Sequence, residues 1–169
     1  MNSRSYRFEA VKEAHLPLLA EILNNYVRNS TATFHTEILS AEDMREKVFF
    51  SNPIYGTFLI KDENEVAGYC SLMLWKKQQA YRHTAEVTIY LKPEFTAKGI
   101  GSAAVKYLEN MAIQNDIRTL VAGCTAENTA SIKMFEKNGF SQCAHFKKMG
   151  FKFGRLLDTV YLQKHFYEV

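Results

Sequence analysis

A short stretch near the middle of the sequence combines residue types that could hold an anionic ligand beside an acid. Gly99 and Gly101 lie immediately before an amphipathic run, Lys98 precedes them, and Glu86 lies in the segment upstream. Glycines let the backbone approach a ligand closely, and the first amides of a helix have no partner within it. Such amides bind anions, and Lys98 adds a positive charge, so the pattern predicts a phosphate-binding turn.

The spacing of the glycines excludes two common phosphate-binding motifs. A Walker loop has four residues between its glycines and continues as Gly-Lys-Ser/Thr, and this pattern is absent around Gly99. A dinucleotide-binding fingerprint has a third glycine, where this chain has Ala104, and an acid about twenty residues later. A Gly-x-Gly pair also occurs in tight turns before helices, so the pair alone does not identify the ligand.

Hydrophobic periodicity assigns these residues to a strand and a helix. From residue 85 to residue 91 apolar and polar side chains alternate, which is the period of a β-strand, and Glu86, Thr88 and Tyr90 share one face. From Ser102 onward the apolar residues follow the period of a helix. The acid is therefore expected on a strand, and the glycines on the turn that leads into the next helix.

The same periodicities predict the remaining elements. The expected order is β-α-α-β-β-β-α-β-α-β-β, an α/β fold with a mixed central β-sheet flanked by helices, in a single domain that spans residues 1–169. The expected elements are a strand at 5–10, a helix at 16–27, a helix from Ser40 that ends before Pro53, strands at Thr57–Lys61, Val66–Lys76 and Ala85–Leu91, a helix from Ser102, a strand at Arg118–Thr125, a helix from Asn128 to Lys137, and strands at Phe140–Phe146 and Leu156–Phe166 separated by a turn at Gly150–Gly154.

Composition and charge argue against several classes of function. The net charge is +3 without a run of basic residues, which argues against a nucleic-acid surface. No apolar stretch is close to the roughly 18 residues of a membrane span, and charged residues interrupt the start before a signal sequence could form. The three cysteines lie far apart and the histidines lack metal-ligand spacing, so neither a disulfide framework nor a metal is expected. We expect a soluble, cytoplasmic protein.

The turn Thr96-Ala97-Lys98-Gly99-Ile100-Gly101 resembles the pyrophosphate-binding loop of the GNAT superfamily of acyl-CoA N-acyltransferases. That loop is usually Gln/Arg-x-x-Gly-x-Gly/Ala, and Thr96 departs from it at the first position. The predicted element order is also the GNAT order. Four further segments resemble the phosphinothricin and methionine-sulfoximine type of amino-acid N-acetyltransferases, namely Asn29–Glu37, Tyr81–Glu86, Asn128–Phe140, and Gly150–Arg155 followed by Asp158.

The resemblance implies that acetyl-CoA is the acetyl donor and that the glycine turn holds its pyrophosphate. The main chain of Ile89, Tyr90 and Leu91 is expected to pair with the pantetheine arm like an added strand. Asn128 and Ser131 are expected to face the pantetheine or the sulfur. The residues expected to bind the donor are Ile89, Tyr90, Leu91, Ala97, Lys98, Gly99, Ile100, Gly101, Ser102, Asn128 and Ser131.

Glu86 is the predicted catalytic residue, acting as general base. An α-amine with a pKa of about 8 is mostly protonated at neutral pH, so acetyl transfer needs a group that accepts a proton directly or through water. An unperturbed glutamate is a weak base, but burial among aromatic residues would raise its pKa. Phe135 lies where these enzymes often have His and the superfamily often has Tyr, so the residue that protonates the leaving thiolate stays open.

The expected acceptor is a small polar amino acid or analogue, such as methionine sulfoximine, methionine sulfone or phosphinothricin. A cation could grip its carboxylate or phosphinate, and Arg82 is preferred among the candidates Lys76, Lys77, Arg82, Lys152 and Arg155. The resemblance assigns the acceptor to the surroundings of Glu86, with aromatic walls. The residues expected to bind it are Phe34, Lys76, Lys77, Gln78, Tyr81, Arg82, Glu86, Val87 and Thr88.

Two other functions stay open on the sequence alone. The same chemistry could act on a polyamine or a protein N-terminus, which an acidic groove would favour, whereas the cations around the predicted site favour an anionic acceptor. A non-catalytic module could bind acyl-CoA, and Thr96 and Phe135 support this reading, while Glu86 counts against it. Relatives of this type are often dimers, so we expect a homodimer.

Overall fold

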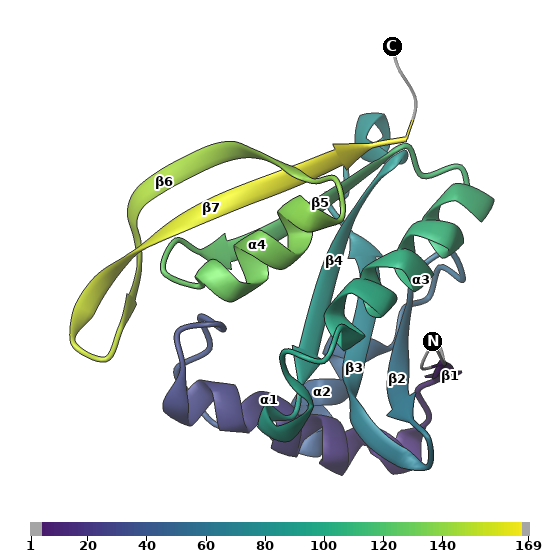
Figure 1. The fold of residues 1–169 in the computed structure, drawn as a ribbon, viewed down its shortest axis with the longest axis horizontal. Helices are drawn as coiled ribbons and strands as arrows, with labels where there is room; N and C mark the ends of the chain where they lie inside the picture. Colours follow the sequence, from purple (N-terminus) through teal and green to yellow (C-terminus); the bar gives the residue numbers. More distant parts are fainter. Residues whose placement is uncertain (1–4, 167–169) are drawn as a thin grey trace.

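The structure is a computed structural model that describes residues 5–166, and these residues form one seven-stranded mixed sheet (Figure 1). The strands lie in the order β1-β2-β3-β4-β5-β7-β6, with β4 parallel to β5 and the other neighbours antiparallel. The predicted fold class and element order are confirmed. The strands are β1 (Tyr6–Ala10), β2 (Gly56–Asp62), β3 (Glu65–Leu74), β4 (Thr84–Leu91), β5 (Thr119–Thr125), β6 (Ser141–Lys152) and β7 (Arg155–His165).

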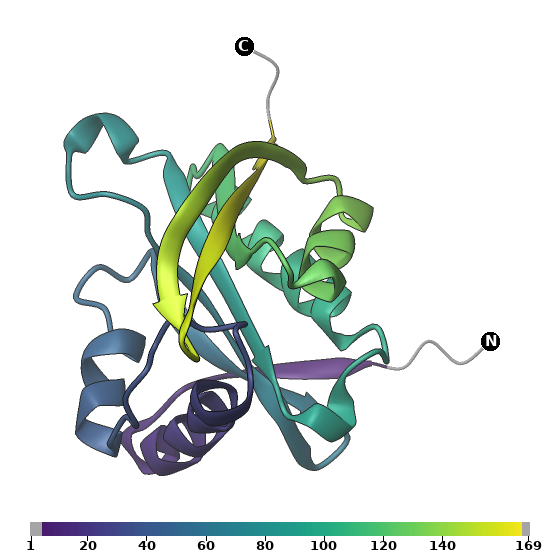
Figure 2. The same ribbon diagram turned by 90° about the vertical axis from the view of Figure 1, so that its left-hand side faces the viewer.

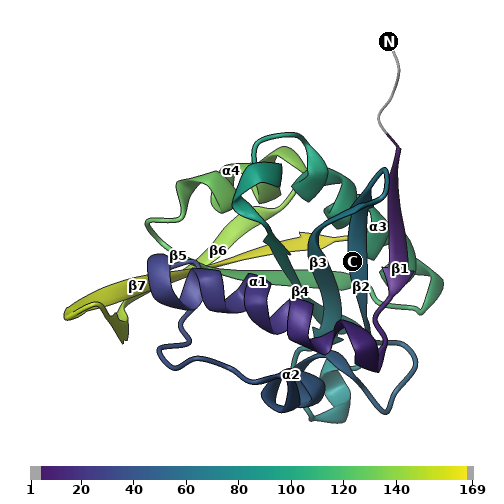
Figure 3. The ribbon, with the colours of Figure 1, turned by 90° about the horizontal axis from the view of Figure 1, so that it is seen from below.

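Two pairs of helices cover opposite faces of the sheet (Figure 3). Helices α1 (Leu16–Asn29) and α2 (Ala41–Val48) pack on one face, and α3 (Ile100–Gln114) and α4 (Thr129–Lys137) pack on the other. Each pair buries its own hydrophobic cluster against the sheet. None of the helices in residues 5–166 combines the length and the hydropathy that crossing a lipid bilayer requires.

The helix boundaries follow from capping as well as from periodicity. The hydroxyl of Ser40 accepts the amide of Asp43 at 3.1 Å, and the Asp43 carboxylate accepts the amide of Ser40 at 2.7 Å. This reciprocal capping box satisfies donors that the start of α2 would otherwise leave unpaired, as the sequence predicts. Helix α3 begins at Ile100, two residues before the predicted Ser102, because Gly99 already takes the N-cap position.

The parallel strands β4 and β5 pair along only part of their length. Residues Thr84–Glu86 pair with Thr119–Val121, and β4 then continues along β3 to Leu91 while β5 continues along β7 to Thr125. Figure 1 shows the two strands diverging toward their carboxyl ends. A gap in the sheet therefore opens beyond Glu86.

Strands β6 and β7 form a long hairpin arm that reaches toward the carboxyl end of α1 (Figure 2). The turn lies within the predicted region Gly150–Gly154 but is shorter, because β6 continues through Gly150 to Lys152 and only Phe153 and Gly154, with φ of 51° and 73°, make the turn. A register shift between Phe146 and Gly150 bends the arm. Periodicity predicted this strand only as far as Phe146, because the irregularity interrupts its alternation there.

Candidate active site

Glu86 lies where β4 and β5 separate. Its neighbours Ala85 and Val87 are buried in the cluster that α3 closes, so strand alternation directs Glu86 to the opposite face, which α1 and α2 cover. The Glu86 side chain is half-buried, and burial raises the pKa of its carboxyl. The side chain of Val87, a predicted acceptor residue, lies in the core and does not share this face.

The backbone N–H and C=O groups of β4 face β3 and the gap in alternation from one residue to the next. The amide of Lys92 donates to a β3 carbonyl at 2.8 Å, and antiparallel pairing alternates, so the main-chain groups of Tyr90 also face β3. Those of Ile89 and Leu91 face away from β3, toward the gap. The Tyr26 hydroxyl donates to the carbonyl of Leu91. Ile89 is therefore the residue whose amide and carbonyl are best directed to pair with a ligand in the gap.

The turn before α3 has the backbone shape that exposes amides. Ala97 and Gly99 both adopt the left-handed conformation, with φ of 58° and 83°. The first helical hydrogen bond runs from the Ala103 amide to the Gly99 carbonyl at 3.1 Å, so the amides of residues 100–102 have no acceptor within the helix. A Cβ added to Gly99 would meet nothing within 4 Å, so the turn faces open space. These amides can bind an anion such as a diphosphate.

Lys98 supplies the positive charge of this turn. Its ammonium lies 5.1 Å from the ring centroid of Phe95, and its carbonyl accepts the Tyr6 hydroxyl at 3.0 Å, which fixes the backbone. The hydroxyl of Thr96 donates to the Pro93 carbonyl at 2.8 Å. Thr96 therefore stabilises its own turn, where the usual GNAT loop has Gln or Arg.

The start of α4 lies directly after β5, as the start of α3 follows β4. The side-chain oxygen of Asn128 caps α4 by accepting the amide of Ser131 at 3.2 Å, and both side chains are half-buried. The two helices are joined by Asn138, whose side-chain amide donates to the Ser102 hydroxyl at 2.9 Å. Because β4 and β5 are parallel, the amino termini of both helices lie at the open end of the gap.

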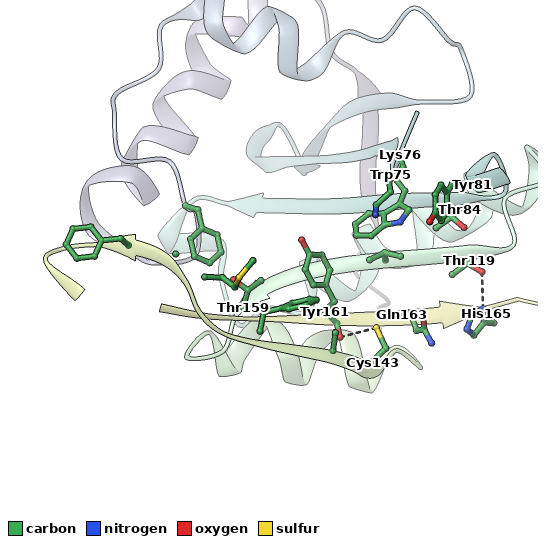
Figure 4. A pocket seen from close by; sticks show the side chains of 17 residues that line it. Trp75, Lys76, Tyr81, Thr84, Thr119, Cys143, Thr159, Tyr161, Gln163 and His165 are labelled. Atoms are coloured by element: carbon green, nitrogen blue, oxygen red, sulfur yellow. Dashed lines mark hydrogen bonds between the residues drawn. The ribbon is translucent and has the colours of Figure 1, made fainter. Parts of the chain in front are cut away.

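A cavity of about 870 Å³ lies on the Glu86 face of the sheet (Figure 4). Thr84, Val121 and Tyr161 contribute to its sheet side, and Phe146 and Phe151 come from the hairpin arm. Three predicted acceptor residues, Phe34, Lys76 and Tyr81, also line it. The other predicted cations and Gln78 do not: Lys77, Gln78 and Arg82 are exposed in the segment between β3 and β4.

Lys76 is held among aromatic rings at this cavity. Its ammonium lies 5.6 Å from the ring centroid of Trp75 and 5.4 Å from that of Tyr81, and the three side chains approach one another in Figure 4. Cation–π contacts of this kind orient a lysine while leaving its N–H groups able to bind an anion. Lys76 is therefore better placed than Arg82 to meet a carboxylate in the cavity.

Lys152, a candidate for binding the acceptor, instead forms hydrogen bonds with backbone carbonyls of the protein itself. Its side chain is 3% exposed, and its ammonium donates to the carbonyls of Ser30 at 2.6 Å, Thr33 at 2.9 Å and Tyr26 at 3.3 Å. These bonds fasten the tip of the arm to the end of α1 and the following loop. That loop carries Phe34.

Arg155 is likewise engaged with the protein. Its guanidinium donates two hydrogen bonds to Glu127, at 2.8 and 2.7 Å, and the Thr31 hydroxyl donates to the same carboxylate. The Arg155 and Thr31 bonds lower the pKa of Glu127 to about 2. The expectation that Lys152 and Arg155 bind the acceptor is therefore corrected, since both hold the loop that forms one wall of the cavity.

The cavity also contains residues that the sequence analysis missed. The rings of Trp75 and Tyr161 meet edge to face with centroids 5.5 Å apart. Burial raises the pKa of the Tyr161 hydroxyl, and the charge of Glu86 adds to the effect, so this tyrosine lies within electrostatic reach of the acid. Trp75, the lone tryptophan, adjoins Lys76 in the sequence, whereas nothing in the sequence links Tyr161 to Glu86. Residues 5–166 contain no group of three or more His, Cys, Asp or Glu side chains that could hold a metal ion.

The fold and the site define a class of protein: an α/β sheet that opens between two parallel strands, with an acid at the point of opening and an anion-binding turn beyond it. Residues 20–140 match the profile of the acetyltransferase (GNAT) family. The chain belongs to this family of enzymes, and the predicted resemblance is confirmed.

Individual relatives and solved structures agree with this assignment. The L-amino acid N-acyltransferase MnaT of Escherichia coli is 32% identical over 161 residues, which cover 94% of this chain and 92% of the relative. The L-methionine sulfoximine/L-methionine sulfone acetyltransferase of Salmonella typhimurium is 29% identical and covers 89% of each chain. The structure of a phosphinothricin acetyltransferase from Sinorhizobium meliloti in complex with AcCoA is 30% identical, with a TM-score of 0.87, and covers 95% of this chain and 88% of that one.

Proposed function

We propose that this acetyltransferase transfers the acetyl group of acetyl-CoA to the α-amine of a small amino acid or analogue, of the methionine sulfoximine, methionine sulfone or phosphinothricin type. The observation that carries the proposal is the position of Glu86, at the end of the β4–β5 pairing where the gap opens, next to Thr84 and Val121, which line a cavity that can admit an amine. The choice of donor and acceptor is supported by the names of the relatives described above: an L-amino acid N-acyltransferase, a methionine sulfoximine/methionine sulfone acetyltransferase, and a phosphinothricin acetyltransferase in complex with AcCoA.

The donor binds in the gap between β4 and β5. The amides of residues 100–102 and the ammonium of Lys98 hold its diphosphate, and the main chain of Ile89 pairs with the pantetheine arm. An amide in the gap can also polarise the thioester carbonyl. Asn128 and Ser131, at the start of α4, face the pantetheine from the other side.

The acceptor enters from the cavity, and Glu86 takes one proton from its ammonium directly or through water. The neutral nitrogen attacks the thioester carbonyl carbon, a C–N bond forms, and the C–S bond breaks as the CoA thiolate leaves. Phe135 is 5% exposed and its ring lies 5.1 Å from that of Phe140, so it is a core residue with no proton to give. The thiolate therefore takes its proton from solvent or a neighbouring group.

The carboxylate of the acceptor is oriented by Lys76, whose ammonium is held between Trp75 and Tyr81. Phe34 covers the acceptor from the loop after α1, and its position is fixed by the arm. A cation that meets the acceptor favours an amino acid over a polyamine, because a polyamine would bring like charge to Lys76.

A homodimer and a cytoplasmic location remain predictions. Large apolar side chains are exposed on the arm, where Met149 and Phe151 are 67% and 65% exposed, and β6 is an edge strand. Such a surface is suited to pairing with a second copy. Light scattering after gel filtration gives the mass in solution, and a mass of one chain would refute the dimer.

The direct test of the proposal is a thiol-release assay with acetyl-CoA and a panel of amino acids, their sulfoximine, sulfone and phosphinate analogues, and polyamines. We expect CoA release with the amino-acid group and little with polyamines. Release with polyamines or an N-terminal peptide alone would support the second acceptor class. CoA binding without release for any acceptor would indicate a non-catalytic module.

A further inference from the structure

The ring of Tyr161 lies across β5 and is directed toward β4. Tyr161 of β7 pairs with Gly123 of β5, and a Cβ added to Gly123 would lie 3.0 Å from Cε1 and 3.5 Å from Cζ of the tyrosine ring. The end of the ring that bears the hydroxyl therefore lies over the backbone of β5, in space that a side chain at residue 123 would fill. Figure 4 shows the hydroxyl pointing away from β7, toward the strand that carries Thr84.

Aromatic contacts hold the ring in this orientation. Trp75, which follows β3, meets it edge to face with centroids 5.5 Å apart, and Phe146 of β6 meets it edge to face at 6.0 Å. Contacts of this kind favour one relative orientation of the rings. The hydroxyl of Tyr161 therefore has a fixed direction before any ligand binds.

The Tyr161 hydroxyl lies near Glu86, at the point where the gap opens. Glu86 pairs with Val121, and Gly123 lies two residues further along β5 on the same face. Burial raises the pKa of the Tyr161 hydroxyl and the charge of Glu86 raises it further, which agrees with this position. Tyr161 lines the large cavity, whereas Glu86 does not. The tyrosine is therefore placed between the acid and the cavity.

The Glu86 carboxylate and the Tyr161 hydroxyl have no hydrogen-bond partner within residues 5–166, and they are not bonded to each other. A half-buried carboxylate or phenol hydroxyl normally has a partner, because leaving it unpaired costs free energy. Both groups can instead bind one ligand group that offers a donor to each of them. An ammonium, with its three N–H groups, is such a ligand group.

We propose that Tyr161 is a further catalytic residue, whose hydroxyl oxygen accepts a hydrogen bond from the reacting nitrogen of the acceptor and holds this nitrogen against Glu86. This inference rests on the proposed function. The ammonium donates one N–H to Tyr161 and another to Glu86, which takes that proton, so an N–H bond breaks and an O–H bond forms on the carboxylate. The neutral amine keeps its hydrogen bond to Tyr161 while it attacks the thioester carbonyl carbon. Tyr161 stays protonated throughout, as its raised pKa favours.

The test begins with Tyr161→Phe, which removes only the hydroxyl and keeps the ring contacts with Trp75 and Phe146. We expect kcat/KM for the best amino acid of the panel to fall about tenfold or more, because a hydrogen bond to a charged group is lost. Tm and the Kd for CoA should stay as in the wild type. Tyr107→Phe is the matched control, because it removes the hydroxyl of another half-buried tyrosine, which stacks on Phe8 at 4.2 Å, and it should leave kcat/KM unchanged.

Binding of the acceptor can be measured without turnover when CoA takes the place of acetyl-CoA. Calorimetry then gives Kd for the amino acid and for its analogue in which hydrogen replaces the amino group. Tyr161→Phe should weaken binding of the amino acid about tenfold and leave binding of the analogue unchanged, because only the amino acid has the nitrogen that bonds to the hydroxyl. Both ligands are compared on the same protein, so a partial loss of folding would affect both alike.

The acidic midpoint of the kcat/KM profile gives a third readout. This midpoint reports the pKa of Glu86 in the free enzyme, where Tyr161 makes no bond to the carboxylate, so Tyr161→Phe should leave it unchanged. A shifted midpoint would mean that Tyr161 acts on Glu86 rather than on the acceptor, and it would overturn the proposal.

Three other results would also overturn it: wild-type kcat/KM in Tyr161→Phe, equal weakening of both ligands, or a lower kcat with an unchanged Kd for the amino acid. The last result would assign the hydroxyl to the leaving thiolate instead. If the wild type acetylates no amino acid, the proposed function itself fails. Acetylation that Tyr161→Phe leaves unchanged refutes only the role of Tyr161.

Discussion

Glu86 and Val121 form the last pair between the parallel strands β4 and β5. Beyond this pair each strand keeps its other neighbour, so the sheet stays rigid on both sides of the gap. The arrangement fixes an acid at the inner end of a cleft whose outer end carries two helix amino termini. A ligand that lies in the gap therefore reaches the Glu86 carboxylate without a conformational change of the protein.

The pH dependence of the reaction should report on Glu86. The base must be ionised, and burial raises its pKa, so kcat/KM should fall at acid pH with a midpoint above the usual range of a glutamate. The profile is measured with an acceptor in the thiol-release assay, and Glu86→Asp serves as the control that keeps a carboxylate. A midpoint at or below that of an exposed glutamate would contradict the assignment of Glu86 as the buried base.

The glycine turn can be tested with a matched pair of substitutions. Gly99→Ala puts a side chain on a left-handed residue, which should cost about 1 kcal/mol and lower Tm by about 2–4 °C. The added methyl group would also project into the open side of the turn, so we expect Kd for CoA to rise about tenfold. Ala97→Gly relieves strain at a neighbouring left-handed residue and should raise Tm. Unchanged CoA affinity in Gly99→Ala would show that the turn does not hold the diphosphate.

The bond between Glu127 and Arg155 should make stability depend on pH. The pKa of Glu127 is lowered to about 2 by Arg155 and Thr31, so the bond stabilises the fold fully above the pKa of an unfolded glutamate, about 4.3, and loses this effect as the pH falls toward 2. Glu127→Gln should therefore lower Tm at pH 7. The difference in Tm between the variant and the wild type should become smaller below pH 5. Glu136→Gln, at an exposed position of α4, is the control. A difference in Tm that does not change between pH 7 and pH 3 would argue against the bond.

Gly150 should control the position of Phe34 in the large cavity. A Cβ at Gly150 would lie 2.3 Å from Cε1 of Phe34, which forces the ring to move. We expect Gly150→Ala to raise KM for the acceptor severalfold while KM for acetyl-CoA stays the same. In a variant that already carries Phe34→Ala, adding Gly150→Ala should change KM for the acceptor little further, and a double-mutant cycle measures this. An equal effect in both backgrounds would mean that Gly150 acts independently of Phe34.

The sequence predicted the strands, the helices and the glycine turn because each is encoded by a local pattern. Alternation marked β4, and the glycines before an amphipathic run marked the start of α3. The two strands of the hairpin arm were predicted, but the continuation of β6 from Phe146 to Lys152 was missed because a register shift interrupts its alternation and because Gly150 suggests a turn, whereas in the fold it makes room for Phe34.

The roles of the cations could not be predicted for a different reason. Lys152 binds carbonyls that lie 119 to 126 residues away along the chain, and no local pattern reveals such partners. Tyr161 is brought toward Glu86 by β7, which pairs with β5 only in the folded sheet. The family resemblance supplied the base and the donor, while the residues that line the cavity of about 870 Å³ could be identified only from the structure.

The most direct test of the central claim is the Glu86→Gln enzyme, studied with acetyl-CoA and the best acceptor of the panel. Calorimetry should give an unchanged Kd for CoA, because the diphosphate is held at the turn before α3. Turnover should fall about 100-fold or more, because the amine loses its base. Turnover like that of the wild type, with CoA still bound, would contradict the claim that the acid at the inner end of the gap drives the reaction.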